Sequence, residues 1–71
     1  MKIGNKIKTL RKESGFTQKE IADKLGIKQS NISDWENDVS RPEYENLIKL
    51  ADLFEESVDY LLREDTESLK D

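Results

Sequence analysis

The twenty residues from Gln18 to Asn37 constrain the fold of this 71-residue chain more than any other segment. Their apolar residues have the spacing of two short helices, and Gly26 marks the turn between the two. A residue at such a turn adopts a positive φ, which glycine does without steric cost. Ala22 is small enough to let the second helix cross the first, and the branched side chain of Ile32 fixes the crossing. The segment therefore predicts two short helices that pack across each other.

The composition allows one small domain and excludes several kinds of site. Of the 71 residues, 34% are hydrophobic and 39% are charged, which suits a single core beneath a charged surface. The sequence has no Cys and no His, so it lacks disulfides, thiol nucleophiles and the commonest general base and metal ligand. No apolar stretch approaches the length of a membrane span. Because a glycine-rich phosphate loop is also missing, we expect no enzyme activity, no metal and no cofactor.

The net charge of −4 is distributed unevenly along the chain. Residues 1–42 carry nine Lys or Arg against six Asp or Glu, whereas residues 43–71 carry three against ten. A basic front and an acidic back are compatible with a nucleic acid bound on one face. The net charge alone instead favours an acidic protein with no nucleic-acid partner, so charge leaves this question open.

Helical periodicity extends over residues 3–63 and predicts an all-α fold, a compact bundle of five helices. We place the helices at roughly residues 3–14, 18–25, 28–36, 43–54 and 58–63. Thr17 and Glu20 have the spacing of a capping box, Gly15 and Gly26 suit helix C-termini, and Pro42 suits a first turn. Residues 1–63 are expected to form the domain, and residues 64–71 a polar, frayed tail.

The last two helices have apolar faces that can be assigned from their spacing. The inner face of the helix at 43–54 is predicted to contain Tyr44, Leu47, Leu50, Ala51 and Phe54. Ser57 is the expected N-cap of the helix at 58–63, with Asp59 in its first turn. Val58, Leu61 and Leu62 are expected to point to one side of that helix.

The expected third helix has one apolar face and one polar face. At about 100° per residue, Ile32 and Trp35 share one side and should face the core. Mostly neutral hydrogen-bonding residues occupy the opposite arc, which contains Gln29, Ser30, Ser33, Asp34 and Asn37. Glutamine can bind adenine with two hydrogen bonds, and serine adapts to several base edges. Short polar residues on an ordinary exposed helix explain the arc equally well, so both interpretations stay open.

The chain resembles the Cro and phage-repressor family over about residues 3–63. The shared features are Thr17-Gln18, Ala22, Gly26-Ile27, Ile32, Trp35-Glu36 and Arg41-Pro42. The resemblance implies a λ-repressor-like domain whose second and third helices form a helix-turn-helix, with the third helix in the DNA major groove. It also implies a cytoplasmic, sequence-specific transcriptional regulator, most often a repressor that occupies a palindromic operator on double-stranded DNA as a weak homodimer.

The resemblance further implies roles for single residues. Those placed at base edges are Gln29, Ser30, Ser33 and Asp34. Those placed at the DNA backbone are Thr17, Gln18, Lys28, Asn31, Asn37, Arg41 and Asn46. Asp34 departs from the family pattern, because a carboxylate near phosphates weakens binding unless it accepts from a cytosine amino group. Lys28 departs as well, since the family commonly places Ser or Thr there as an N-cap.

Further expectations concern residues away from the groove. Arg11 and Glu36 lie at the edges of apolar faces, and the family pattern joins them in a structural ion pair between the first and third helices. Leu53 and Tyr60 fall outside the expected inner faces and, with Leu69 in the tail, are candidates for a dimer contact. The alternative function is an acidic protein-interaction module, antitoxin-like or regulator-binding, that makes no direct contact with DNA.

Overall fold

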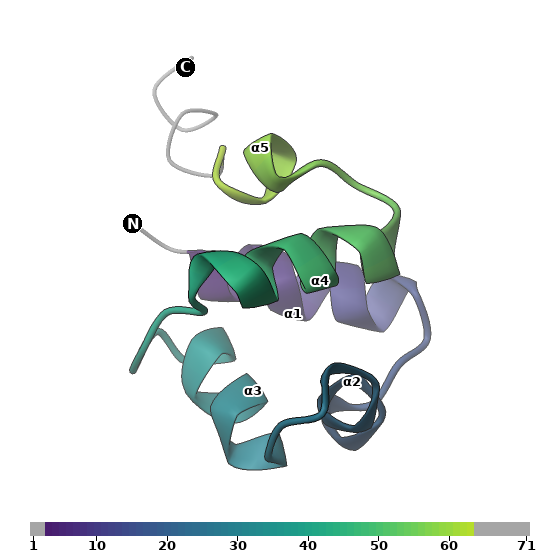
Figure 1. Cartoon of the computed structure of the whole chain (residues 1–71), viewed down its shortest axis with the longest axis vertical. Helices are drawn as coiled ribbons and strands as arrows, with labels where there is room; N and C mark the ends of the chain where they lie inside the picture. The colour runs from purple at the N-terminus through teal and green to yellow at the C-terminus, as the bar shows by residue number, and fades with distance from the viewer. Residues whose placement is uncertain (1–2, 64–71) are drawn as a thin grey trace.

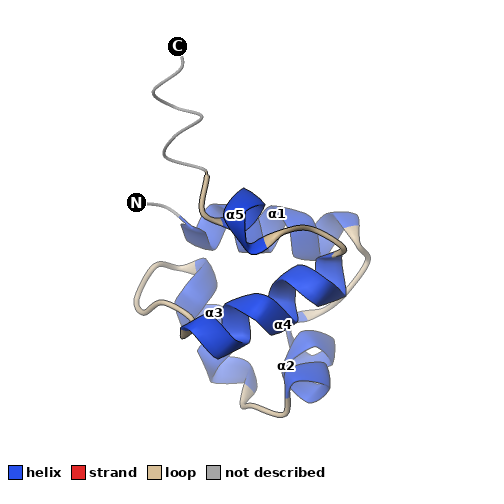
Figure 2. Cartoon of the chain, turned by 45° about the horizontal axis from the view of Figure 1, so that its top comes forward, coloured by secondary structure: helices blue, strands red, loops and turns tan. Residues whose placement is uncertain are grey.

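Five α-helices account for most of the described residues, 3–63, of the computed structural model (Figure 1). The helices are α1 (Ile3–Glu13), α2 (Gln18–Leu25), α3 (Gln29–Glu36), α4 (Tyr44–Phe54) and α5 (Val58–Leu61). Between residues 3 and 63 there is no strand, so the expected all-α bundle is confirmed (Figure 2). The tail at 64–71, including Leu69, lies outside the described residues.

The helices are arranged around α1 and α4, which lie one behind the other in Figure 1. The pair formed by α2 and α3 packs below them, and α5 covers the opposite side (Figure 1). α1 contacts both α3 and α5, while α4 contacts α5 and α2. This arrangement leaves α3 at one end of the domain, with its outer face uncovered by any other helix described.

Local hydrogen bonds begin α2 and α5, and end α2, at the residues that the sequence predicts. The Thr17 hydroxyl accepts from the Glu20 N–H at 3.0 Å, and Glu20 Oε1 accepts from the Thr17 N–H at 2.8 Å, which forms the capping box. Gly26 ends α2 with a φ of 73°, and Ser57 caps α5 by accepting from the Tyr60 N–H at 3.0 Å. Lys28 precedes α3 without a side-chain cap, so packing must hold the first turn of that helix.

The hydrophobic core lies where all five helices meet. Each helix contributes one side chain with essentially no exposure: Ile7, Ile21, Ile32, Leu50 and Leu61. The rest of the core consists of Ile3, Leu10, Ala22, Leu25, Trp35, Leu47, Ala51 and Phe54. Because every helix shares this one cluster, the short helices α2, α3 and α5 gain their stability from packing and not from their own length.

Two residues expected on inner faces are exposed. Tyr44 is 71% exposed because it is the first residue of α4, where the helix extends past the edge of the core. Leu62 is 39% exposed because α5 ends one residue earlier, at Leu61. The helix predicted at 58–63 is therefore two residues shorter in the structure, and the helix predicted at 43–54 begins one residue later, at Tyr44.

Two residues expected outside the inner faces are instead half-buried. Leu53 and Tyr60 both pack against the core, since the apolar stripe of a globular helix is wider than a single row of side chains. The Tyr60 ring is also covered by Lys6, whose Nζ lies 4.1 Å from the ring centroid. Neither residue is therefore the exposed apolar side chain that the dimer prediction assumed.

Gly4 marks a close contact between the start of α1 and the end of α3 that the sequence analysis missed. Its N–H donates to Asp38 Oδ1 at 3.1 Å, and Asp38 has a left-handed φ of 59°. A Cβ atom at Gly4 would collide with the carbonyl oxygens of Trp35 and Glu36. The sequence does contain a signal for this contact, because a glycine inside a helical pattern weakens the helix and usually has a packing reason.

We predict that Gly4→Ala lowers the free energy of unfolding by about 1–3 kcal/mol, the usual cost of overpacking. An alanine in place of a helical glycine otherwise stabilises by about 0.5–1 kcal/mol, so the predicted sign is opposite to the helix-propensity effect. Urea denaturation measures the change. Asn5→Ala, at the next and exposed position of α1, is the control and should be nearly neutral. A denaturation midpoint for Gly4→Ala equal to or above wild type contradicts the close contact.

Candidate nucleic-acid interface

The α2–turn–α3 unit has the geometry that its small and branched residues predict. Ala22 and Ile32 are buried, and α2 and α3 pack directly against each other. The turn is closed by the Ile27 N–H, which donates to the Ala22 carbonyl at 3.0 Å, and by the positive φ of Gly26. Two short helices are thus held at a fixed crossing, with the outer face of α3 directed away from the core.

The polar arc of α3 lies on the surface, as expected. Gln29, Ser30 and Asn37 are exposed, and Ser33 and Asp34 are half-buried. Asn37 Nδ2 donates to Ser33 Oγ at 3.4 Å, one turn earlier on the same helix. Ile32 and Trp35 face the core, so this surface consists of hydrogen-bonding side chains on a helix that is anchored from behind.

The ion pair expected between Arg11 and Glu36 is present and bidentate. Arg11 Nε donates to Glu36 Oε2 at 2.5 Å and Arg11 Nη2 donates to Oε1 at 3.1 Å. The side chains are 12% and 2% exposed, respectively. Arg11 Nη1 also donates to the Phe16 carbonyl at 3.0 Å. A single guanidinium therefore joins α1, the α1–α2 loop and the last residue of α3.

Gln18 extends this ion pair toward the surface of α3. Its Nε2 donates to Glu36 Oε1 at 3.0 Å, and its Oε1 accepts from Gln29 Nε2 at 3.4 Å. Both polar atoms of the Gln18 side chain are therefore engaged inside the protein. The group that remains for a phosphate is its backbone N–H, one of the N-terminal amides that lack a helical acceptor. A contact of Gln18 with the DNA backbone stays a prediction, whereas its hydrogen bond to Glu36 was not predicted from the sequence.

Three candidates for the DNA backbone converge on one pocket, although they come from different segments. Asn31 of α3, Arg41 of the α3–α4 loop and Asn46 of α4 line a polar pocket of about 270 Å³. Trp35, Ser40 and Glu43 complete its lining. The exposed guanidinium of Arg41 and the two amide side chains could bind a phosphate there. The carboxylate of Glu43 would repel the same phosphate. Thr17 and Lys28 are exposed near the starts of α2 and α3 and do not line this pocket.

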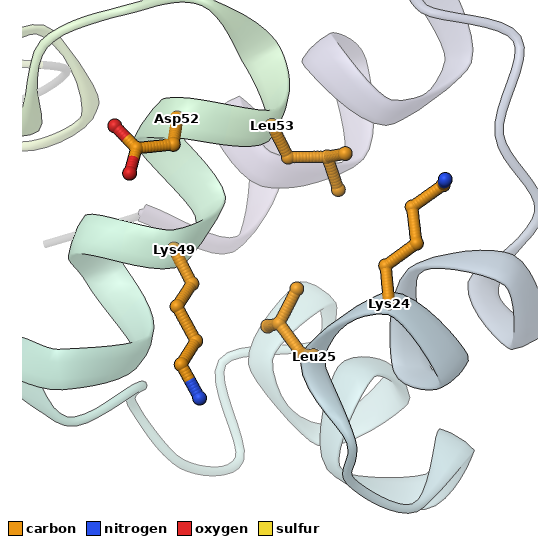
Figure 3. Close-up of a pocket in the computed structure, with 5 residues that line it drawn as sticks. All are labelled: Lys24, Leu25, Lys49, Asp52 and Leu53. Carbon is orange, nitrogen blue, oxygen red and sulfur yellow. The ribbon is translucent and has the colours of Figure 1, made fainter.

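A second hollow lies between α2 and α4 (Figure 3). It has a volume of about 400 Å³ and is lined by Lys24, Leu25, Lys49, Asp52 and Leu53. Leu25 and Leu53 point toward each other across it, while Asp52 turns away (Figure 3). None of the residues predicted to contact DNA lines this hollow, which is distinct from the polar face of α3.

Other kinds of site find no support in the described part of the chain. Among residues 3–63 no group of three or more His, Cys, Asp or Glu side chains could hold a metal ion. Within the same residues, no helix is both long enough and apolar enough to cross a membrane.

This geometry defines a helix-turn-helix domain. The second helix of the unit, α3, packs on the core with one side and presents a polar face with the other. The chain belongs to the helix-turn-helix family of Cro and phage-repressor type, whose profile, described as "Helix-turn-helix", matches residues 7–61. The predicted family and fold are therefore confirmed.

The chain is similar to two curated regulators. It is 43% identical over 70 residues to the HTH-type transcriptional regulator ImmR of Bacillus subtilis, a match that covers 99% of this chain and 55% of ImmR. It is 38% identical over 61 residues to the cryptic phage CTXphi transcriptional repressor RstR of Vibrio cholerae, covering 86% of this chain and 54% of RstR. The chain thus spans about half the length of these relatives.

Two solved structures, both of proteins in complex with DNA, have the same fold. SinR, described as the master regulator for biofilm formation, superposes with a TM-score of 0.78 and 36% identity, covering 84% of this chain and 97% of that one. The P22 c2 repressor bound to a synthetic operator superposes with a TM-score of 0.83 and 32% identity, covering 89% and 96%. The roles assigned above to single residues stay predictions.

We predict that Arg11→Met destabilises the domain by about 3–5 kcal/mol, because it leaves the buried Glu36 carboxylate without its cation. Urea denaturation followed by Trp35 fluorescence measures the loss. Lys19→Met is the matched control, since it removes an exposed i,i+4 ion pair with Asp23 and should change stability by less than about 1 kcal/mol. Equal losses in the free energy of unfolding for the two substitutions would show that the buried ion pair stabilises the domain no more than an exposed one.

Proposed function

We propose that this chain is a sequence-specific DNA-binding domain of a transcriptional regulator, which acts as a repressor by occupying its operator as a dimer. The observation that carries the proposal is the exposed polar face of α3 on a helix-turn-helix whose other side is buried. The similarity to ImmR and RstR supports a regulator. The similarity to SinR and to the P22 c2 repressor supports double-stranded DNA as the ligand. Such a regulator would act in the cytoplasm.

In the proposed complex, α3 lies in the major groove. Gln29 and Ser30 enter first, with Ser33 and Asp34 one turn further along the helix. The free N–H of Gln18 at the start of α2, with the Thr17 hydroxyl as a further donor, binds a phosphate on one side of the groove. The pocket formed by Asn31, Arg41 and Asn46 binds a phosphate on the other side. Lys28 and Asn37 extend these backbone contacts at the two ends of α3.

The contact between two copies is better placed at the start of α4 than at the residues named from the sequence. The most exposed apolar side chains in residues 3–63 are Val39 and Tyr44, at 72% and 71%. Ile48 is exposed one turn after Tyr44 and on the same face of α4. These side chains adjoin the loop that contains Arg41, so a second copy docked on them would sit beside the DNA. Such a small apolar contact gives a weak dimer that assembles mainly on a palindromic site.

We predict that selection from random duplexes enriches a palindrome, and that affinity for it falls steeply with salt. The logarithm of the binding constant should fall against the logarithm of salt concentration with a slope of about −0.9 per phosphate neutralised. Arg41→Ala should weaken binding by a similar factor on all sequences and reduce that slope by about one per site. Lys8→Ala, which removes an equal charge from α1, is the control and should leave both the affinity and the salt slope nearly unchanged.

Failure of the wild-type chain to bind any duplex in dilute buffer would reject the proposal. It would leave the acidic protein-interaction module as the function to pursue, because that module requires no duplex binding at all.

For the dimer, we predict that Tyr44→Ser weakens binding to the full palindrome about tenfold while binding to a single half-site stays unchanged. The loss of one well-packed aromatic contact commonly costs more than about 1.4 kcal/mol, which corresponds to this factor. Leu62→Ser removes another exposed apolar side chain, far along the chain, and serves as the control. Gel-shift titrations on the two duplexes measure the difference. An equal loss on both duplexes would argue against a role for Tyr44 in dimerisation.

A further inference from the structure

The hollow between α2 and α4 is an apolar slot with a lysine on each side. Leu25 and Leu53 point toward each other across it, and Lys24 and Lys49 lie on opposite sides of these two leucines (Figure 3). The Asp52 carboxylate turns away from the slot, so the two ammonium groups set the charge beside it (Figure 3). An apolar side chain with carboxylates next to it is the chemistry that such a slot accommodates.

The end of α5 presents this complementary chemistry on the same chain. Leu62 is 39% exposed, although its side chain is apolar. Asp59 lies one turn earlier, and the exposed Glu55 and Glu56 belong to the loop before α5. Arg63 pairs with Asp59 at 3.2 Å, but both side chains are mostly exposed, and such a pair is weak. The end of α5 is therefore an exposed leucine in an acidic segment.

Leu62 cannot fill the hollow of its own chain. The hollow lies between α2 and α4, whereas α5 covers the opposite side of the domain from α2 (Figure 1). We propose that the hollow receives Leu62 of a second copy of this chain, with Lys24 and Lys49 beside the carboxylates at the end of that copy's α5. The charges of the two surfaces are opposite, and the exposed leucine on one surface matches the apolar slot on the other.

The proposed contact differs from the dimer contact at Val39 and Tyr44, because it joins two different surfaces. Such a heterologous contact leaves a hollow and a Leu62 unused at the ends of each pair, so it can extend to further copies. Neither surface contains a residue that we predict to contact DNA, so the inference does not depend on DNA binding. Under the proposed function, the contact would join copies bound at neighbouring operators, and Leu62→Ser would leave binding to a single palindrome unchanged.

A receiver variant and a donor variant isolate this contact in solution. The receiver is Leu62→Ser, which keeps the hollow but loses the side chain that fills it. The donor is Lys49→Glu, which keeps Leu62 but places a repelling carboxylate beside its own hollow. Both substitutions are at exposed positions, so both variants should fold. Neither variant should associate with itself through this contact, whereas the receiver should bind the donor.

Nuclear magnetic resonance of an isotope-labelled receiver measures the binding. We expect the backbone N–H resonances of the residues that line the hollow to shift as unlabelled donor is added to about 1 mM, a range that suits so small a contact. The Lys49→Glu/Leu62→Ser double variant is the matched control titrant and should not shift them. It retains Val39 and Tyr44, so shifts caused by the other dimer contact appear with both titrants.

The charges on the hollow give a second readout. Adding Lys24→Ala to the receiver should raise the donor concentration at half-maximal shift about two- to fivefold, as for one exposed ion pair. Higher salt should raise it as well, because salt screens exposed charges. Lys8→Ala, an exposed position on α1, is the control and should leave this concentration unchanged.

Two results would overturn the inference, and neither depends on whether the chain binds DNA. One is a folded receiver whose hollow resonances do not respond to the donor. The other is an equal response to the donor and to the double variant, which would show that Leu62 does not enter the hollow. An unchanged half-maximal concentration in the Lys24→Ala receiver would contradict the pairing of charges across the contact.

Discussion

The Arg11–Glu36 ion pair is the contact on which the placement of α3 depends. Moving a carboxylate out of water is costly, and a bidentate arginine offsets that cost only in a narrow range of geometries. An apolar contact at the same place would tolerate sliding and rotation, because dispersion forces have little directionality. The main effect of the ion pair is therefore to define the position of α3, and its net contribution to the free energy of folding is smaller. It fixes the last residue of α3 against α1 and, through the Phe16 carbonyl, against the loop that leads into α2.

Two further contacts complete the support of α3. Ile32, in the middle of the helix, is fully buried, and α3 packs against both α1 and α2. Just past its end, Asp38 accepts from the Gly4 N–H, and the absence of a Cβ at Gly4 lets α1 approach the final carbonyls of α3. A helix of eight residues is unstable by itself in water, so these tertiary contacts supply the order it has. Because these contacts already order α3, its polar face loses little conformational entropy when it binds a ligand.

The sequence predicts those parts of this structure that depend on neighbours along the chain. The capping box at Thr17, the left-handed Gly26 and the burial of Ile32 and Trp35 follow from spacing and backbone sterics. Through-space features do not: the carbonyl contact at Gly4 and the Gln18–Glu36 hydrogen bond depend on how distant segments meet. Tyr44 shows the limit within a helix, because periodicity gives the direction of a side chain but not where the core ends. The pairing of Arg11 with Glu36 came from the family resemblance and not from the spacing.

An acidic chain that binds DNA must obtain favourable electrostatics locally, and the structure offers two local sources. The first is the free N–H groups at the start of α2, which attract a phosphate without adding net charge. The second is Arg41, which lines a polar pocket together with the amide side chains of Asn31 and Asn46. Glu43 lines the same pocket as Arg41, and Asp34 lies on the polar face of α3. Under the proposed function, both carboxylates repel the phosphates of every sequence alike. Under the proposed function, these carboxylates lower non-specific affinity, which depends on phosphate contacts, more than the affinity for an operator that also offers matched bases. The negative charge then raises the ratio between the two affinities, and this ratio determines how well a repressor finds its site among many others.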